Sequence, residues 1–222
     1  MVTKALVLAA GLGSRLQALT EHQPKVLVKV SGRAILEHQL ISLSQIGITE
    51  CIIATGYKGS MIQDQFGSKY GSISLKYVDN PIFATTNNIY SLYLLKDHVK
   101  DACLLLEGDV LVEDSVLLDV VSNEASNIAV LDHVSAGTDG TIVFANHNRV
   151  IEMVLKEHQS HLTNIDSALK TVNIYKFSKN MLLDHLFPLL EEAISEGQIN
   201  VFYESVLAQL IKTKTLDLVP MI

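Results

Sequence analysis

The sequence predicts an α/β protein with three layers, in which a Rossmann-like, mixed but mostly parallel sheet is flanked by helices. Three short apolar runs, Lys4–Leu8, Cys51–Ala54 and Ala102–Leu106, show no alternation of polar and apolar residues. Strands that are covered on both faces have this appearance, which is typical of a parallel sheet. A stretch with helical spacing separates the first two runs. The chain is therefore expected to begin with a strand, a helix and a parallel strand.

The first predicted helix covers 33–46. Its apolar stripe consists of Leu36, Leu40 and Leu43, and Gly47 is expected to end it. The elements that we expect to follow in this half are a helix over 58–66, a strand over 73–78 and a helix over 88–96 that is entered from the cap-rich run Thr85–Asn87.

After Asp109 the pattern changes to shorter strands, which indicates a mixed or antiparallel region. The expected elements are a helix over 115–121, strands over 128–131, 141–144, 150–155 and 171–177, helices over 179–195 and 201–212, and a last strand over 216–219. Pro188 is expected to break the first of these two late helices because it lacks the backbone N–H. With no tract that resembles a linker, we expect one domain over 1–222.

The composition limits the partners. The chain has 222 residues, 48% of them hydrophobic, and a formal net charge of −7. A negative chain without Lys/Arg patches argues against a nucleic-acid partner. No apolar segment approaches the length of a membrane span, so we expect no membrane insertion and a cytoplasmic protein. The two cysteines, Cys51 and Cys103, head apolar runs and are expected to be buried thiols.

The loop that follows the first apolar run is predicted to bind a polyphosphate. It carries Gly11, Gly13, Ser14 and Arg15, and Lys25 follows ten residues later. Glycines let backbone N–H groups come close to phosphate oxygens, and nearby cations neutralise their charge. A dinucleotide fingerprint is excluded because Leu stands where its third glycine belongs, and a Walker A motif is absent. The remaining alternative is a glycine-rich turn without a ligand.

Two carboxylates are candidates for a Mg²⁺ site. Asp109 follows the third apolar run and comes directly after Gly108, and Mg²⁺ favours one or two carboxylates together with substrate phosphates. The alternative is a turn residue that caps the next helix. Asn200 and Glu204 are four residues apart and would share one face of the last predicted helix. The alternative there is an N-cap at Asn200 with an exposed Glu204.

These candidate residues are expected to lie close together at one edge of the sheet. Ligands of open α/β sheets lie outside the carboxyl ends of the strands. Gly11, Gly56 and Asp109 each follow the end of a predicted strand.

The segment Leu8–Leu16, with Thr20 and the pair Pro24-Lys25, resembles the signature LAAGxGxRL…T…PK of nucleotidyltransferases of the sugar-phosphate type. This resemblance implies that Arg15 and Lys25 contact the phosphates of a nucleoside triphosphate and that Asp109 binds the catalytic Mg²⁺. The residues that it assigns to nucleotide binding are Leu8, Ala9, Ala10, Gly11, Gly13, Ser14, Gly56 and Tyr57. It also implies a nucleotide half over about 1–110 and an acceptor half over about 111–222.

Further segments resemble a narrower group, the cytidylyltransferases of phosphonates and small alcohol phosphates, which includes the enzymes for 2-aminoethylphosphonate and bacterial phosphocholine. They are Asn80–Leu92, Glu107–Val110, Asp139–Thr141, Lys170–Tyr175 and Asn200–Val206. The resemblance implies that CMP is transferred from CTP to 2-aminoethylphosphonate with release of pyrophosphate, and that Glu204 completes the metal site. Phosphocholine is the alternative acceptor. A catalytically inactive regulatory module is the alternative of another class.

Acceptor-binding residues are expected to match the charge of the acceptor. A quaternary ammonium is usually held by an aromatic cage, and this chain has no Trp but seven Tyr and six Phe. A primary ammonium needs carboxylate and amide oxygens. The candidates are Asn88 and Tyr90, with Asp139 weaker, while Asn87 and Asp166 could add oxygens or, for Asn87, only cap a helix. The sequence is compatible with a homodimer and leaves the oligomeric state open.

Overall fold

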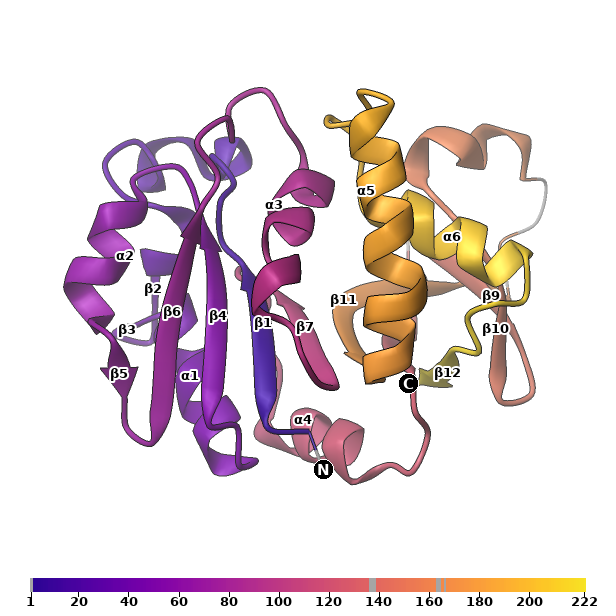
Figure 1. The fold of residues 1–222 in the computed structure, drawn as a ribbon, viewed down its shortest axis with the longest axis horizontal. Coiled ribbons are helices and arrows are strands. Elements are labelled where there is room, and N and C mark those ends of the chain that lie inside the picture. Colours follow the sequence, from indigo (N-terminus) through magenta and orange to yellow (C-terminus); the bar gives the residue numbers. More distant parts are fainter. Residues whose placement is uncertain (1, 136–138, 163–164, 166) are drawn as a thin grey trace.

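A computed structural model describes residues 2–135, 139–162, 165 and 167–222, with the backbone alone for Ser14, Arg15, Gln17 and His161. Its described strands form one ten-stranded mixed sheet and a two-stranded hairpin, and helices flank the large sheet (Figure 1). The order of the main path is β10-β9-β11-β7-β1-β4-β6-β5. This large sheet runs through both halves of the chain.

The parallel part of the sheet lies at its centre. β1 (Lys4–Leu8) pairs in parallel with β4 (Glu50–Thr55) on one side and with β7 (Cys103–Glu107) on the other. β6 (Ile73–Asp79) is parallel to β4, and the short β5 (Lys69–Tyr70) adds an antiparallel edge. The three apolar runs thus form adjacent parallel strands, as the sequence predicts.

The antiparallel part begins at β11 (Leu169–Phe177), which pairs with β7. It continues through β8 (Ile128–His133), β9 (Ile142–Asn146), β10 (Arg149–Val154) and β12 (Val219–Met221), of which β12 runs parallel to β8. The change of pattern after Asp109 therefore marks the change of strand direction, which confirms a mixed sheet.

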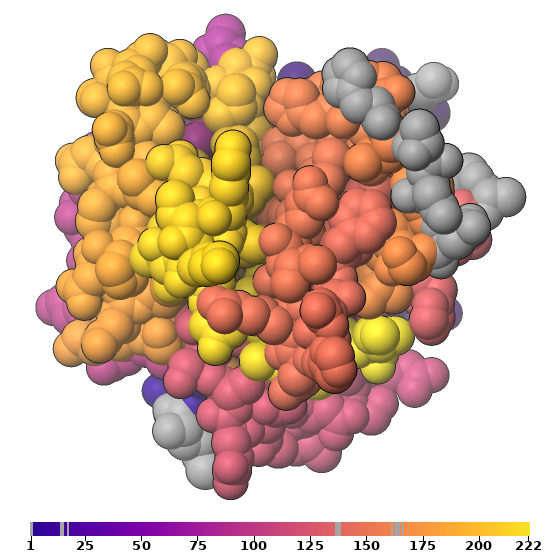
Figure 2. Space-filling model, turned by 90° about the vertical axis from the view of Figure 1, so that its right-hand side faces the viewer, coloured from indigo at the N-terminus to yellow at the C-terminus, as the bar shows by residue number. Residues whose placement is uncertain are grey.

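Alternate residues of β1 separate two cores, one on each face of the sheet. Leu6 and Leu8 belong to one core and Ala5 and Val7 to the other. The helices on the Leu6 side are α3 (Asn88–Leu94), α5 (Phe187–Ser195) and α6 (Glu204–Lys212), and those on the Ala5 side are α1 (Ile35–Gln45), α2 (Gly59–Phe66) and α4 (Asp114–Ser122). Figure 2 shows the end of the molecule where α6, in yellow, lies beside the segment of β10.

Shorter elements join these layers. They are the 3-10 helices η1 (Ser14–Leu19), η2 (Lys25–Leu27), η3 (Lys96–His98) and η4 (Lys156–His161), the π-helix η5 (Met181–Leu186) and the hairpin of β2 (Lys29–Val30) with β3 (Arg33–Ala34). No helix among the described residues is long and apolar enough to cross a membrane.

Several elements differ from the sequence prediction. The helix predicted over 33–46 begins at Ile35, because Arg33 and Ala34 pair with the preceding strand. Pro188 does not break its helix: the wider π turn of η5 leads directly into α5, where the proline occupies the first turn and its missing N–H is tolerated. The last strand covers Val219–Met221 instead of 216–219.

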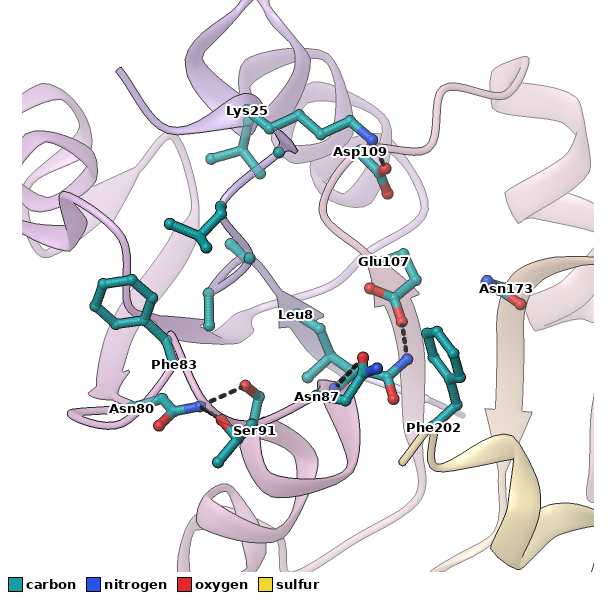
Figure 3. Close-up of a pocket in the computed structure, with 18 of the residues that line it drawn as sticks. Leu8, Lys25, Asn80, Phe83, Asn87, Ser91, Glu107, Asp109, Asn173 and Phe202 are labelled. Atoms are coloured by element: carbon teal, nitrogen blue, oxygen red, sulfur yellow. Dashed lines mark hydrogen bonds and ion pairs between the residues drawn. The ribbon is translucent and has the colours of Figure 1, made fainter. Parts of the chain in front are cut away.

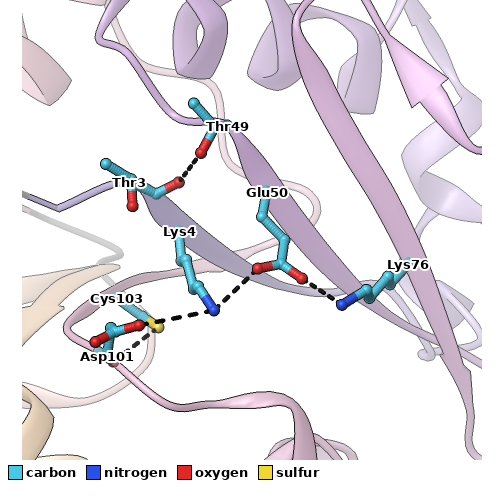
Figure 4. Close-up of polar contacts among 7 residues, drawn as sticks. All are labelled: Thr3, Lys4, Thr49, Glu50, Lys76, Asp101 and Cys103. Atoms are coloured by element: carbon cyan, nitrogen blue, oxygen red, sulfur yellow. Dashed lines mark hydrogen bonds and ion pairs between the residues drawn. The ribbon is translucent and has the colours of Figure 1, made fainter.

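A network of charged side chains lies at the amino ends of the central strands (Figure 4). Glu50, at the start of β4, accepts from Lys4 of β1 at 2.9 Å and from Lys76 of β6 at 2.5 Å. The two lysines hold the pKa of this carboxyl below its ordinary value. Near this network the Cys103 thiol is buried, and burial raises the pKa values of Cys51 and Cys103 to about 12.

Candidate active site

A cavity of about 420 Å³ opens at the carboxyl ends of β1 and β7, opposite the charged network (Figure 3). The segment between β6 and α3 forms one wall, and β11 and the start of α6 form another. The predicted site residues that line it are Leu8, Ala9, Ala10, Gly11, Gly13, Lys25, Asn88, Asp109 and Glu204. Residues from both halves of the chain thus meet in one cavity.

The glycine loop is held close to the following segment by its own geometry. Gly13 has a φ of +65°, and a Cβ there would lie 2.9 Å from the Thr20 Cγ2 atom. The Thr20 hydroxyl donates to the Gly13 carbonyl at 3.0 Å, which ties the loop to the turn before Lys25. At Gly11, by contrast, a Cβ would meet nothing within 4 Å. The fold therefore requires a glycine at position 13, whereas position 11 borders open space.

Lys25 and Asp109 form an ion pair across the mouth of the cavity (Figure 3). Both side chains keep solvent contact, with exposed fractions of 26% and 34%. Gly108 allows the loop of Asp109 to pack closely against the segment of Lys25, because a Cβ at this position would lie 2.7 Å from the Val26 Cγ1 atom. From α1, the buried Gln39 donates to the carbonyls of Glu107 and Val110 at 2.8 Å each and so fixes the Asp109 loop from behind.

Asn88 connects the carboxylates deeper in the cavity. Its Nδ2 donates to Glu107 Oε1 at 2.9 Å and to Glu204 Oε2 at 3.4 Å, while its Oδ1 accepts from the Tyr203 N–H at 2.9 Å. The amide that the sequence assigned to the acceptor is thus engaged with the two glutamates. Asn87 caps α3, as its alternative interpretation proposed, by accepting from the Asn88 N–H at 2.8 Å.

This end of the cavity is crowded with carboxyl groups. The Glu107 side chain is half-buried in the cavity wall. Its loss of water contact, together with the charges of Glu204 and Asp109, raises its pKa to about 8. The hydrogen bond from Asn88 and the charge of Lys25 only partly oppose the rise. Glu204 is 3% exposed, and burial raises its pKa as well. Three carboxyl groups around one cavity fit a cationic ligand.

A divalent cation fits this donor set. No group of three or more His, Cys, Asp or Glu side chains within the described part of the chain is placed to hold a metal by itself. Mg²⁺ does not require such a group, since it is bound through one or two carboxylates and completes its shell with phosphates and water. Asp109 and Glu204 line the cavity and could supply these carboxylates to a metal that arrives with a triphosphate.

Three residues that the sequence proposed do not reach the cavity. Tyr90 does not belong to its described lining and packs against the core, 6.2 Å from the ring of Tyr93. Asp139 lies outside it and pairs with Lys156 at 2.5 Å. Asn200 lies in an exposed turn and not on the helix of Glu204, because α6 begins only at Glu204. The prediction that Asn200 and Glu204 share one helix face is therefore wrong. The alternative of an exposed Glu204 is also wrong.

Gly56 and Tyr57, which were predicted to bind the nucleotide, also lie outside the described lining of the cavity and support the loop from behind. A Cβ at Gly56 would lie 2.8 Å from the Ala10 carbonyl oxygen, and the Tyr57 N–H donates to that same oxygen at 3.1 Å. The backbones of Ser14 and Arg15 belong to η1, but their side chains lie outside the described part of the chain, as does all of Asp166.

The sequence analysis missed Glu107, Asn173, Phe83 and Phe202 as lining residues. Glu107 had a detectable signal, because it follows a buried strand in the same way as Asp109. The signal of Asn173 is a backbone conformation in the middle of a strand, with a φ of 60°, and sequence patterns do not reveal it.

The comparisons with known proteins identify the family of this chain. A family model described as nucleotidyl transferase matches residues 4–216. The chain belongs to this family. It is 34% identical to the CMP-5'-(3-aminopropyl)phosphonate synthase of Streptomyces rubellomurinus over 85% of this chain and 30% of that protein. It is also 40% identical to the choline-phosphate cytidylyltransferase of Streptococcus pneumoniae over 46% of this chain and 43% of that protein. The aligned region thus spans less than half of either relative.

Solved structures of nucleotidyltransferases share the fold. The CTP:phosphocholine cytidylyltransferase of Streptococcus pneumoniae matches with a TM-score of 0.75 at 23% identity, over 100% of this chain and 90% of that chain. A glucose-1-phosphate thymidylyltransferase of Bacillus anthracis matches with a TM-score of 0.80 at 20% identity, over 99% of this chain and 87% of that chain. The three-layer fold that the sequence predicts is therefore confirmed.

Proposed function

We propose that the protein transfers CMP from CTP to 2-aminoethylphosphonate and releases pyrophosphate. The observation that carries this proposal is the cavity itself: a glycine loop with the Lys25–Asp109 pair lies at one end, and the carboxyl groups of Glu107 and Glu204 lie at the other. The first end suits a triphosphate, and the second suits an acceptor with a positive charge. The likeness to a phosphonate cytidylyltransferase from Streptomyces rubellomurinus supports a phosphonate with an amine.

The reaction needs positioning more than proton transfer. An oxygen of the acceptor's phosphonate forms a bond to the α-phosphorus of CTP, while the bond from that phosphorus to the bridging oxygen breaks and pyrophosphate leaves. A phosphonate is already ionised at neutral pH, so no general base is required. The task of the protein is to align the two anions and to neutralise the charge that develops between them.

Lys25 and Asp109 are placed for these tasks. In the ligand-free arrangement they neutralise each other. Lys25 would turn to the phosphates when CTP binds, and Asp109 would take Mg²⁺ together with Glu204. Mg²⁺ bound there would supply positive charge to the triphosphate. Arg15 is proposed as a further phosphate ligand on the strength of the family signature, since η1 begins next to the loop.

Phosphocholine is the second candidate acceptor. Phe83 and Phe202 line the cavity and offer aromatic surface for a quaternary ammonium, and the chain is similar to a choline-phosphate cytidylyltransferase. The carboxyl groups of the cavity do not distinguish phosphocholine from 2-aminoethylphosphonate, because both acceptors carry one positive charge.

The test is pyrophosphate release with a panel of nucleotides and acceptors. We expect turnover with CTP and Mg²⁺ and the highest kcat/KM for 2-aminoethylphosphonate. Phosphocholine as the best acceptor would replace the proposed one, and a sugar 1-phosphate as the only acceptor would contradict both. Binding of CTP without turnover of any acceptor would support the inactive regulatory module instead.

A further inference from the structure

Asn173 has an unusual backbone conformation for its place in the fold. Among the described residues other than glycine, five have a positive φ, and four of these lie in turns: Ser31, Lys58, His147 and Lys214. Asn173 is the one that lies inside a strand, with a φ of 60° in the middle of β11. Asparagine tolerates this region better than most residues, but such a conformation within a strand indicates a local constraint.

The conformation coincides with an irregularity in the pairing of β11. The register of β11 with β8 shifts between Thr171 and Tyr175, on either side of Asn173. On the other edge of β11, Ile174 is paired with Leu106 of β7, so Asn173 and Glu107 are the next residues facing each other on adjacent strands. Both line the cavity, and Figure 3 shows them on the same side of it, next to Phe202. The bulge therefore brings an amide beside a carboxylate.

The side-chain oxygen of Asn173 has no hydrogen-bond donor. Oδ1 is buried and lacks any partner, although buried amide oxygens are nearly always paired. The terminal torsion of an asparagine is soft, so rotation of the amide can turn this oxygen toward the cavity. Glu107 and Glu204 already accept from Asn88, and no hydrogen bond joins either of them to the Asn173 oxygen. A cationic ligand would hold these carboxyl groups ionised, as acceptors only, so in the occupied site the donor for the Asn173 oxygen would come from the ligand or a water.

We infer that Asn173 and Glu107 together bind the ammonium group of the acceptor and select a primary ammonium over a quaternary one. A primary ammonium has three N–H donors, which can satisfy the amide oxygen and the carboxylate at once. A trimethylammonium has the same charge but no donor, so it leaves the Asn173 oxygen unpaired. A site that hydrogen-bonds an N–H discriminates strongly against an analogue that lacks it. The inference rests on the proposed cytidylyl transfer and names the residue that decides its acceptor.

The experiment compares 2-aminoethylphosphonate with its N,N,N-trimethyl analogue in the wild type and in Asn173→Gly. Glycine adopts the positive φ without strain, so this variant removes the side chain while it keeps the bulge. We expect kcat/KM for the primary amine to fall about tenfold or more in Asn173→Gly. For the trimethyl analogue it should stay within about twofold, so that the selectivity nearly disappears. The KM for CTP should not change.

A conservative variant separates hydrogen bonding from packing. Asn173→Asp keeps an acceptor oxygen and also tolerates the left-handed region, so it should retain the preference for the primary amine. An equal loss for both acceptors in Asn173→Gly, or unchanged selectivity, would overturn the inference, because a structural amide bound to water would behave in this way. Wild-type protein that transfers CMP to neither acceptor would instead overturn the proposed function itself.

Discussion

Glu50 and Glu107 occupy opposite ends of β4 and β7, the two strands that flank β1, and have opposite electrostatic surroundings. Glu50 begins β4, lies between two lysines and has a lowered pKa. Glu107 ends β7, lies among other carboxyl groups and has a pKa raised to about 8. The carboxylate at the amino ends of the strands is thus paired within the protein, whereas Glu107 at the carboxyl ends lies among carboxyl groups that oppose its ionisation. Such a perturbed group in a cavity is a candidate for binding, whereas the Glu50 network is expected to serve stability.

The largest effect is expected at the mouth of the cavity. Lys25→Ala should lower kcat by roughly 10²-fold or more, because removing one charge that stabilises the transferring phosphate costs on the order of 3 kcal/mol in the barrier. Asp109→Asn should slow turnover and raise the Mg²⁺ concentration required for half-maximal rate. Steady-state kinetics with a Mg²⁺ titration measure both. Because both side chains keep solvent contact, the free energy of unfolding should change by less than about 0.5 kcal/mol. Near-wild-type turnover in either variant would remove that residue from the site.

The Glu107→Gln variant tests whether the carboxyl group of Glu107 lowers the stability of the fold. The amide keeps an acceptor for Asn88 and does not have to take up a proton on folding at neutral pH, so the melting temperature should rise by about 3 °C. Turnover of an amine acceptor should fall about tenfold, because a bound ammonium would hold the carboxyl in its charged form and an amide has no such form. Thermal unfolding and kinetics on the same preparation measure the two effects. A lower melting temperature would show that the carboxylate stabilises the fold.

The two glutamates should also differ in the sign of their pH dependence, measured with metal-free protein. The folded pKa of Glu107 is raised to about 8, so the folded state binds more protons and the free energy of unfolding falls as the pH rises from about 4.5 to about 8. The Glu107→Gln variant should lack this decline. A decline of equal slope in the variant would assign it to another group.

Glu50→Gln should have the opposite dependence and a smaller effect. Its folded pKa is lowered, so the stability that it contributes is present above the ordinary carboxyl pKa and is lost as the pH falls through the folded value. We expect the variant to lose about 1 kcal/mol at neutral pH, since the two ion pairs are partly exposed. Denaturant unfolding at pH 7 and at pH 3 measures this loss and its disappearance. Turnover should be unchanged, and a loss of activity at matched stability would link this end of the sheet to catalysis.

Tyr90 and Asp139 provide the smallest expected effect. Both lie outside the described lining of the cavity, so Tyr90→Phe and Asp139→Asn should change the KM of the acceptor by less than about twofold. Acceptor titrations at saturating CTP measure this. A rise of tenfold in either variant would restore the assignment that the sequence suggested and would require the acceptor to extend beyond the cavity.

The sequence predicted the strands and the glycine loop because their signals are local. An apolar run defines β1, and the spacing of Gly11, Gly13 and Lys25 defines the loop that follows. The acceptor end was predicted less well, because it depends on where separate segments meet. Asn88 was assigned to the acceptor, yet its amide is engaged by Glu107, Glu204 and Tyr203. No pattern in the sequence indicates the contacts of Asn88 with Tyr203 and Glu204, which are more than 100 positions away.

The position of a helix boundary is a second reason why the sequence prediction differs from the structure. The apolar spacing of the last helix extends back to Val201, and this predicted a shared face for Asn200 and Glu204. In the structure the turn before Glu204 brings Phe202 to the cavity and lets the Tyr203 N–H reach Asn88. Tertiary contacts therefore decide where the helix begins, and apolar periodicity cannot show them.

The direction of β11 bears on how such enzymes diversify during evolution. Because β11 is antiparallel to β7, the middle of a strand reaches the cavity at Asn173, whereas the glycine loop belongs to β1 on the other side of β7. After gene duplication, one copy could change its acceptor by substitutions within β11 and leave the nucleotide loop and all loop lengths intact. Solved structures of this fold carry the names of enzymes for glucose 1-phosphate, phosphocholine and inositol 1-phosphate. On the proposed function, the acceptor contact on β11 and the nucleotide loop after β1 lie on different strands, so a change in one leaves the other intact.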